Sequence, residues 1–90
     1  MLKNLEDIIL LARERKKNPI KGSYTDKLLE AKFLAKEKVL EEVSELIQAV
    51  EESSNKIHEA ADVLYHLMIY LEANDIKIEE IMEELASRRK

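Results

Sequence analysis

A chain of 90 residues with 38% charged side chains, one glycine and one proline is typical of one domain, residues 1–90, built from amphipathic helices rather than a sheet. Its 15 basic residues are interleaved with 19 acidic ones, which argues against a nucleic-acid partner, and the absence of cysteine excludes disulfides, thiolate zinc sites and cysteine nucleophiles. No apolar run approaches the roughly 20 residues that cross a bilayer, so we expect no membrane contact and a cytoplasmic location.

The first helix is expected from Leu2 to about Lys16, where apolar residues recur at helical spacing. Asn18-Pro19 then ends it. Residues 20–26 contain the only glycine and several hydroxyl side chains, so they are expected to form a loop that leads to a hydroxyl-capped helix. Free backbone N–H groups at such a helix start can also receive phosphate, although a hydroxyl there is usually only a cap.

One apolar stripe continues over residues 26–52 and is interrupted by charge near Lys36, where the helix can break. Unbroken, this helix would be about 40 Å long at about 1.5 Å per residue, which is too long for a chain of this size to cover alone. A short chain also buries a small fraction of its surface. The sequence therefore predicts an all-α, antiparallel helical bundle that is completed by homodimerisation or by a higher homo-oligomer.

Two further helices are expected after this stripe. Residues 53–55 form the next turn, with Ser54 or Asn55 as the cap of a helix that runs to about Glu72. A turn over residues 73–75 leads to a short final helix that ends in Arg88-Arg89-Lys90.

Carboxylates recur three residues apart on two neighbouring helices, as Glu42 with Glu45 and as Glu59 with Asp62. Residues at this spacing share a helix face, so antiparallel helices would direct the four side chains toward one point. A close cluster of this kind needs a cation, a proton or basic partners. Mg²⁺ is the simplest resolution, because it prefers oxygen ligands and commonly acts beside phosphates, which favours nucleotide or pyrophosphate chemistry.

Lys38 and His66 lie one helical turn from these acids on the same faces. Lys38 can meet a substrate phosphate as a point charge, and His66 can bind substrate or water. A buried histidine satisfied by a neighbouring carboxylate is an equally good interpretation of His66, and no role is predicted for His58. Glu-rich stretches are often only solvated helix faces, whereas a di-iron bundle needs Glu-x-x-His pairs and this chain has Asp62 instead.

Three segments together resemble the MazG-type nucleotide pyrophosphohydrolases, and most of all the phosphoribosyl-ATP pyrophosphohydrolase branch. The first motif is an EExxE…ExxD signature, carried by residues 38–45 and by residues 59–66, which end in Tyr-His. The second is a segment that begins Gly-Ser-Tyr-Thr and ends Leu-Leu, at residues 22–29, and the third is Leu-x-x-Arg at residues 85–88. The likeness covers almost the whole chain. This chain has Leu40 where the family usually has glycine. The segment after the Ser-Tyr-Thr loop also lacks the glycine usual in the family, and it is one residue shorter than in the family.

The resemblance implies Mg²⁺-dependent hydrolysis of 1-(5-phosphoribosyl)-ATP to the AMP form and pyrophosphate in histidine biosynthesis, by a homodimer of helices. It assigns Mg²⁺ binding to the four clustered acids Glu42, Glu45, Glu59 and Asp62. The expected catalytic residues are Glu41, Glu42 and Glu45, with Glu41 orienting a ligand or assisting the deprotonation of water. The expected substrate contacts are Lys38, Ser23, Tyr24, Thr25 and His66.

Two other functions compete with this expectation. A MazG-like enzyme that removes pyrophosphate from free NTPs or dNTPs would share the metal site and differ at the substrate end. A helical dimerisation module without catalysis would neither release pyrophosphate nor respond to Mg²⁺.

Overall fold

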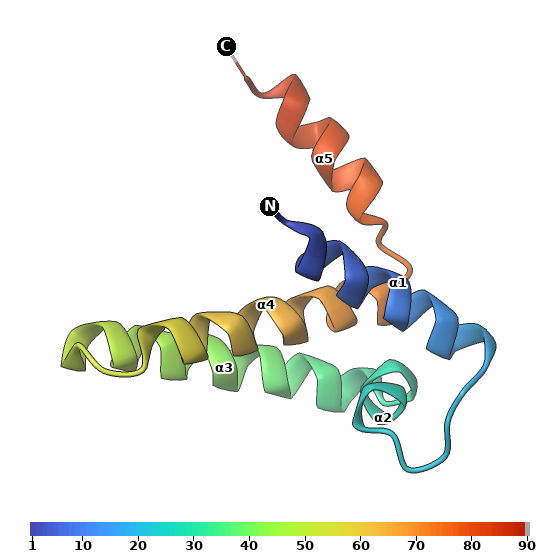
Figure 1. The fold of residues 1–90 in the computed structure, drawn as a ribbon, viewed down its shortest axis with the longest axis horizontal. Coiled ribbons are helices and arrows are strands. Elements are labelled where there is room, and N and C mark those ends of the chain that lie inside the picture. Colours follow the sequence, from blue (N-terminus) through green and yellow to red (C-terminus); the bar gives the residue numbers. More distant parts are fainter. Residues whose placement is uncertain (90) are drawn as a thin grey trace.

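The computed structural model describes residues 1–89, which fold into five α-helices and contain no strand (Figure 1). The helices are α1 (Lys3–Lys17), α2 (Tyr24–Glu30), α3 (Lys32–Glu52), α4 (Lys56–Ala73) and α5 (Ile78–Ser87). The all-α prediction is therefore confirmed, while Lys90, the last residue of the predicted domain and of its predicted basic end, lies outside the described residues. None of the helices in residues 1–89 is both long and apolar enough to span a bilayer.

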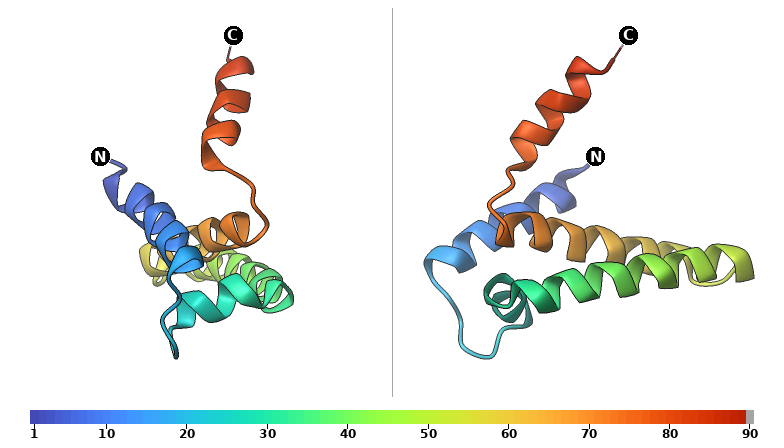
Figure 2. Two further views of the ribbon diagram at one scale, coloured as in Figure 1. Left: turned by 90° about the vertical axis from the view of Figure 1, so that its right-hand side faces the viewer. Right: turned by 180° about the vertical axis from the view of Figure 1, so that it is seen from behind.

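The two longest helices, α3 and α4, run antiparallel side by side as a hairpin (Figures 1 and 2). The buried residues of α3 recur every seven positions, at Ala35, Glu42 and Ala49, and so lie on one face. Two of the three are alanines, which let a neighbouring helix approach closely. At the tip, Ser53 and Asn55 adopt left-handed conformations, with φ of 55° and 52°. Asn55 takes the N-cap position of α4, as one of the two predicted caps, but its side chain makes no capping hydrogen bond.

Four helices meet in one small core. Ala12 of α1, Leu28 of α2, Ala35 of α3 and Ile69 of α4 form its buried centre. The predicted break near Lys36 is wrong, because the chain turns five residues earlier, at Ala31, where φ is −102° and ψ is 82°. We attribute the turn to packing, since it separates α2 from α3 and lets Leu28 enter the core fully buried.

The loop before α2 ends as expected, with a hydroxyl cap. The Ser23 hydroxyl accepts a hydrogen bond from the Asp26 backbone N–H at 3.3 Å. Helix α2 nevertheless begins at Tyr24, so the last residues of the predicted loop form the first turn of a helix. This places three side chains of α2, Tyr24, Thr25 and Asp26, in fixed positions beside the hairpin.

The final helix, α5, was predicted in the right place, although it ends at Ser87. It leaves the rest of the chain and points away from the hairpin (Figures 1 and 2). None of its residues is buried, and it makes no extended contact with the other described helices. Its polar tie to them is the bidentate pair between Arg13 and Glu79, with N–O distances of 2.8 and 2.7 Å.

The apolar stripe predicted over residues 26–52 divides between two faces of the hairpin. Five large apolar side chains of α3 remain 37–73% exposed, and we call them the outer stripe: Phe33, Leu40, Val43, Ile47 and Val50. Their spacings of seven, three, four and three residues match the repeat of a coiled-coil seam. An exposed seam of this kind indicates a surface that packs against another helix.

Candidate active site

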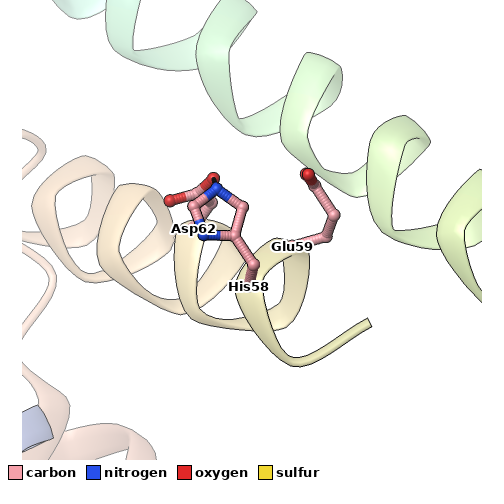
Figure 3. A group of neighbouring side chains, drawn as sticks. All are labelled: His58, Glu59 and Asp62. Atoms are coloured by element: carbon pink, nitrogen blue, oxygen red, sulfur yellow. Dashed lines mark ion pairs between the residues drawn. The ribbon is translucent and has the colours of Figure 1, made fainter. Parts of the chain in front are cut away.

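The predicted acids gather along the hairpin in two groups that overlap. Glu42, Glu45 and Glu59 each offer an oxygen, and these atoms all lie within 4.8 Å of one another. Asp62 belongs to a second group with His58 and Glu59, in which the ligand atoms satisfy the same 4.8 Å limit (Figure 3). Glu59 is common to both groups, and Figure 3 shows it extending from α4 toward α3.

Two oxygens in this cluster are buried without a hydrogen-bond partner, Oε2 of Glu42 and Oε2 of Glu59. Glu42 as a whole is only 7% exposed. A buried carboxylate oxygen that has lost its water and gained no donor is destabilising unless a cation or a proton compensates for it. The donor set consists of oxygen atoms, which suits a hard divalent cation such as Mg²⁺.

The electrostatics of the cluster agree with this interpretation. Burial raises the pKa of Glu42, and the nearby charge of Glu45 raises it further. Burial and then Glu45 likewise raise the pKa of Glu59. Both shifts mean that the negative forms of these side chains are disfavoured where they stand. A bound cation would reverse that preference, because it attracts the charged form.

Glu41 and Lys38 lie beside this cluster and pair with each other. The Lys38 ammonium is 3.3 Å from Oε2 of Glu41, and this hydrogen bond raises the pKa of Lys38. Glu41 belongs to neither group of potential metal ligands in residues 1–89. The pair therefore offers a cation and a half-exposed carboxylate next to the acids, and the roles predicted for both residues stay predictions.

Helix α2 is fastened to α4 by two pairs of polar side chains. The Tyr24 hydroxyl lies 2.9 Å from Nε2 of His66, and Oγ1 of Thr25 lies 2.5 Å from the Tyr65 hydroxyl. The other ring nitrogen of His66, Nδ1, is 2.8 Å from the Asp62 carbonyl oxygen. Because a carbonyl only accepts, Nδ1 carries the proton, and in the neutral ring Nε2 accepts from Tyr24.

His66 is thus satisfied inside the protein, by a tyrosine and a backbone carbonyl rather than by the carboxylate expected in the alternative interpretation. The substrate contacts predicted for Tyr24, Thr25 and His66 remain predictions, and would require these hydrogen bonds to be shared or exchanged. Tyr65 was not predicted as a member of this group. Its position directly before His66 was the available signal.

The Ser23 end of α2 is held by Arg15 of α1. The Arg15 guanidinium donates to the Ser23 hydroxyl at 2.6 Å and lies 3.8 Å from the buried carboxylate of Asp26. Asp26 also accepts a hydrogen bond from the Ile20 N–H. Ser23 and Tyr24 line an open recess together with two lysines that the sequence reasoning missed, Lys21 and Lys27. Cations at a capped helix start suit a phosphate group.

This arrangement of an acidic cluster beside a capped, basic helix start agrees with the comparison with known proteins. The model of the phosphoribosyl-ATP pyrophosphohydrolase family matches residues 2–89. The chain belongs to this family. Membership in the phosphoribosyl-ATP pyrophosphohydrolases confirms the resemblance seen in the sequence and the prediction of a hydrolase that acts on a phosphoanhydride.

Individual members of the phosphoribosyl-ATP pyrophosphohydrolase family are similar over most or all of the chain. The phosphoribosyl-ATP pyrophosphatases of Methanococcoides burtonii and Methanosphaerula palustris are each 40% identical, over 94% and 100% of this chain and 91% and 93% of their own lengths. The histidine biosynthesis bifunctional protein HisIE of Pyrococcus furiosus is 45% identical, and this chain spans 42% of it. No solved structure gives a significant match.

Against this family background, the residue that the sequence reasoning missed most clearly is His58. Its Nε2 lies 3.4 Å from Oδ2 of Asp62 on the next turn of α4. The signal was their spacing of four residues, which places two side chains on one helix face just as the spacing of three between Glu59 and Asp62 does.

Proposed function

We propose that this chain hydrolyses 1-(5-phosphoribosyl)-ATP to 1-(5-phosphoribosyl)-AMP and pyrophosphate in histidine biosynthesis, with Mg²⁺ as its cofactor. Family membership and the names of the relatives support the reaction. The observation that carries the proposal is the cluster of Glu42, Glu45 and Glu59, with its two buried and unpartnered oxygens.

The four acids Glu42, Glu45, Glu59 and Asp62 would hold the cofactor. Bound Mg²⁺ neutralises charge on phosphate oxygens and lowers the pKa of water. Around it, Glu41 would orient the attacking water or take its proton, and Lys38 would bind a phosphate. Water attacks a phosphorus of the α–β anhydride, the bridging P–O bond breaks, and pyrophosphate leaves with the bond's electron pair. No protein nucleophile is needed.

The substrate end of the site would be formed by α2 and the loop before it. Ser23, Tyr24 and Thr25 stand at a helix start fixed by Arg15 and by the contacts to Tyr65 and His66. This start lies beside Lys21 and Lys27 in the open recess. We assign the ribosyl phosphate or the triphosphate to this region, because both are anions that helix N-termini and lysines bind.

The enzyme would act as a homodimer or higher homo-oligomer. The outer stripe supports this, because five large apolar side chains at a coiled-coil repeat are exposed on a chain with a small core. Packing two outer stripes together would also complete the predicted antiparallel bundle. This would bury apolar surface that one chain leaves in water.

Pyrophosphate release measured from synthetic phosphoribosyl-ATP and, in parallel, from a panel of dNTPs tests the reaction. The expected result is Mg²⁺-dependent release that is much faster with phosphoribosyl-ATP. Faster release from dNTPs would instead identify a MazG-like enzyme of other specificity. No release from any nucleotide, together with an unchanged melting temperature on adding Mg²⁺, would leave a helical dimerisation module.

A further inference from the structure

Arg15 of α1 contacts the start of α2 without reaching the open recess that Ser23 lines. Its guanidinium donates a hydrogen bond to the Ser23 hydroxyl at 2.6 Å and lies 3.8 Å from the carboxylate of Asp26. The recess has a volume of about 880 Å³, and Ser23 belongs to its lining whereas Arg15 borders a different, smaller recess. The arginine therefore stands one side chain away from anything that the open recess binds.

The Ser23 hydroxyl has one hydrogen to donate and two lone pairs that can accept. Both lone pairs are used, because the oxygen accepts from Arg15 and, at 3.3 Å, from the backbone N–H of Asp26. Within residues 1–89 these are the hydrogen bonds of this hydroxyl, and it donates none. Its hydrogen is therefore available to a ligand, and that ligand must be an acceptor.

The positive charge of Arg15 makes this hydroxyl a stronger donor. A hydrogen bond from a charged group is shorter and stronger than a neutral one, and the group that accepts it is polarised to donate more strongly in turn. The distance of 2.6 Å agrees with a charge-assisted bond. A negatively charged oxygen is the acceptor that gains most from such a donor.

Asp26 keeps the guanidinium in this place. Its side chain is 8% exposed, and one of its oxygens, Oδ2, accepts a hydrogen bond from the Ile20 N–H. The other oxygen, Oδ1, is buried without a hydrogen-bond partner and lies nearest to Arg15. Because water screens buried charges less than exposed ones, this carboxylate attracts Arg15 and holds it at Ser23.

The charges around the open recess also favour an anion once Arg15 is included. Two lysines and two carboxylates belong to the lining, namely Lys21, Lys27, Asp26 and Glu30. These four charges cancel, so the guanidinium beside Asp26 makes the local charge positive. A recess with a positive local charge raises the local concentration of anions.

We propose that Arg15 is a positioning residue for substrate binding, which directs the single hydrogen of the Ser23 hydroxyl toward a phosphate group in the open recess. Ser23 then acts as a donor to the substrate besides capping α2, and Arg15 acts through Ser23 without touching the substrate. The inference rests on the proposed function in that the anion is a phosphate of phosphoribosyl-ATP.

A double-mutant cycle on Arg15 and Ser23 tests this role. Binding of phosphoribosyl-ATP to the full chain is measured by titration calorimetry in EDTA, so that turnover plays no part. Ser23→Ala removes the donor and should weaken binding about tenfold, a usual loss for a hydrogen bond to a charged group. Arg15→Gln should weaken it about as much, because the glutamine oxygen can accept the hydroxyl hydrogen.

The decisive measurement is Arg15→Gln in the Ser23→Ala background. Its further effect on binding should be less than threefold, the part that comes from the charge of Arg15 alone, because two residues that act through one contact do not give additive losses. Arg15→Lys keeps a cationic donor and should weaken binding less than Arg15→Gln does. If Arg15→Gln does not fold, Arg15→Lys takes its place in the cycle.

Arg13→Gln is the matched control. Arg13 lies in the same helix and also pairs with a buried carboxylate, that of Glu72 at 3.2 Å, but it does not line the open recess. This substitution should leave the affinity for phosphoribosyl-ATP unchanged. It separates the loss of a buried ion pair from the loss of a positioned donor.

Steady-state kinetics in Mg²⁺ give a second readout, which a purely structural role of Arg15 would not produce. KM for phosphoribosyl-ATP should rise in Arg15→Gln while kcat changes less than twofold, because neither Arg15 nor Ser23 belongs to a group of potential metal ligands in residues 1–89. A general disturbance of the fold would lower kcat as well and would reduce the helical circular dichroism.

The two proposals fail in different ways. Independent losses in the cycle, equal losses in Arg13→Gln and Arg15→Gln, or no binding of phosphoribosyl-ATP in EDTA would each overturn the role of Arg15, while Mg²⁺-dependent pyrophosphate release stands. Absence of release from every nucleotide overturns the proposed function, and a coupled loss of binding would still establish that Arg15 and Ser23 act together on an anion.

Discussion

The hydroxyl of Tyr24 in α2 hydrogen-bonds to Nε2 of His66 in α4, at 2.9 Å. Because Nδ1 of the same ring donates to the Asp62 carbonyl, one histidine connects the start of α2 to the turn of α4 that carries an acid of the cluster. The two ends of the proposed site are therefore linked by two consecutive hydrogen bonds. A movement of α2 would therefore shift His66 and, through it, the backbone of Asp62.

Tyr24→Phe tests this link, because it removes the hydroxyl and keeps the ring, which stacks on Tyr65 at 6.5 Å between centroids. We expect the free energy of unfolding to fall by about 0.5–1.5 kcal/mol, the usual net value of one hydrogen bond. We also expect KM for phosphoribosyl-ATP to rise, because α2 is less firmly placed. Urea denaturation and steady-state kinetics measure the two effects.

Tyr70→Phe is the matched control for that prediction. The Tyr70 hydroxyl makes no side-chain hydrogen bond within residues 1–89, so this change should alter neither stability nor KM appreciably. Equal effects of the two substitutions would show that the Tyr24 hydroxyl has no special role.

Glu42→Gln tests whether the buried acid is held for a cation. The substitution keeps the shape of the side chain and removes the charge that burial disfavours. At a Mg²⁺ concentration one hundred times Kd, the free energy of unfolding of the unmodified chain should rise by about 2.7 kcal/mol. Its melting temperature should rise accordingly. Mg²⁺ should have little effect on Glu42→Gln, which should also lose pyrophosphate release.

Differential scanning calorimetry with Mg²⁺ and with EDTA measures this difference. Glu80→Gln, which removes a carboxylate from α5 and leaves the cluster intact, serves as the control. If Mg²⁺ raised the melting temperature of Glu42→Gln as much as that of the unmodified chain, Glu42 would not be a ligand. Glu45→Gln and Asp62→Asn should likewise abolish turnover without unfolding the chain.

The approach of the acids could be predicted from the sequence, because helix periodicity fixes which side chains share a face. Glu42 and Glu45 on one helix and Glu59 on the next did come together. The division of the acids into two overlapping groups, with Asp62 beside His58, was harder to predict from the sequence. Residues three apart differ by about 60° around a helix and residues four apart by about 40°, so Asp62 lies nearer in angle to His58 than to Glu59.

The break at Ala31 had no local signal, since alanine is the best helix former and no glycine or proline is near. It follows from the packing of Leu28 between helices, which becomes visible only in three dimensions. The contacts of α2 with Tyr65 and His66 join residues about 40 positions apart. No periodicity in the sequence specifies such pairs.

The Arg13–Glu79 pair should hold α5 in place in a pH-dependent way. The Arg13 hydrogen bond lowers the pKa of Glu79 from 4.5 to about 2. A lowered pKa in the folded state stabilises the contact above pH 4.5, and this contribution is lost as the pH falls toward 2. We therefore expect amide hydrogen exchange in α5, corrected for the intrinsic effect of pH, to become less protected over that interval.

Glu79→Gln should show the reduced protection already at neutral pH and should lose the extra pH dependence of α5. Glu83→Gln, an acid of the same helix with no described ion pair, should behave like the unmodified chain. If protection of α5 were the same in all three proteins at every pH, the pair with Arg13 would not position this helix.

The outer stripe gives the last prediction, which concerns assembly. Ile47→Glu places a charge in the middle of the exposed seam, where a second chain would have to bury it. Sedimentation velocity should show the homodimer dissociation constant raised at least tenfold, about 1.4 kcal/mol, with the helical circular dichroism retained. Ile57→Glu makes the same change at an exposed isoleucine of α4, outside the stripe, and should leave assembly unchanged. The outer stripe is not the interface if the unmodified chain sediments as a monomer at all concentrations. The same conclusion holds if the Ile47→Glu variant assembles normally.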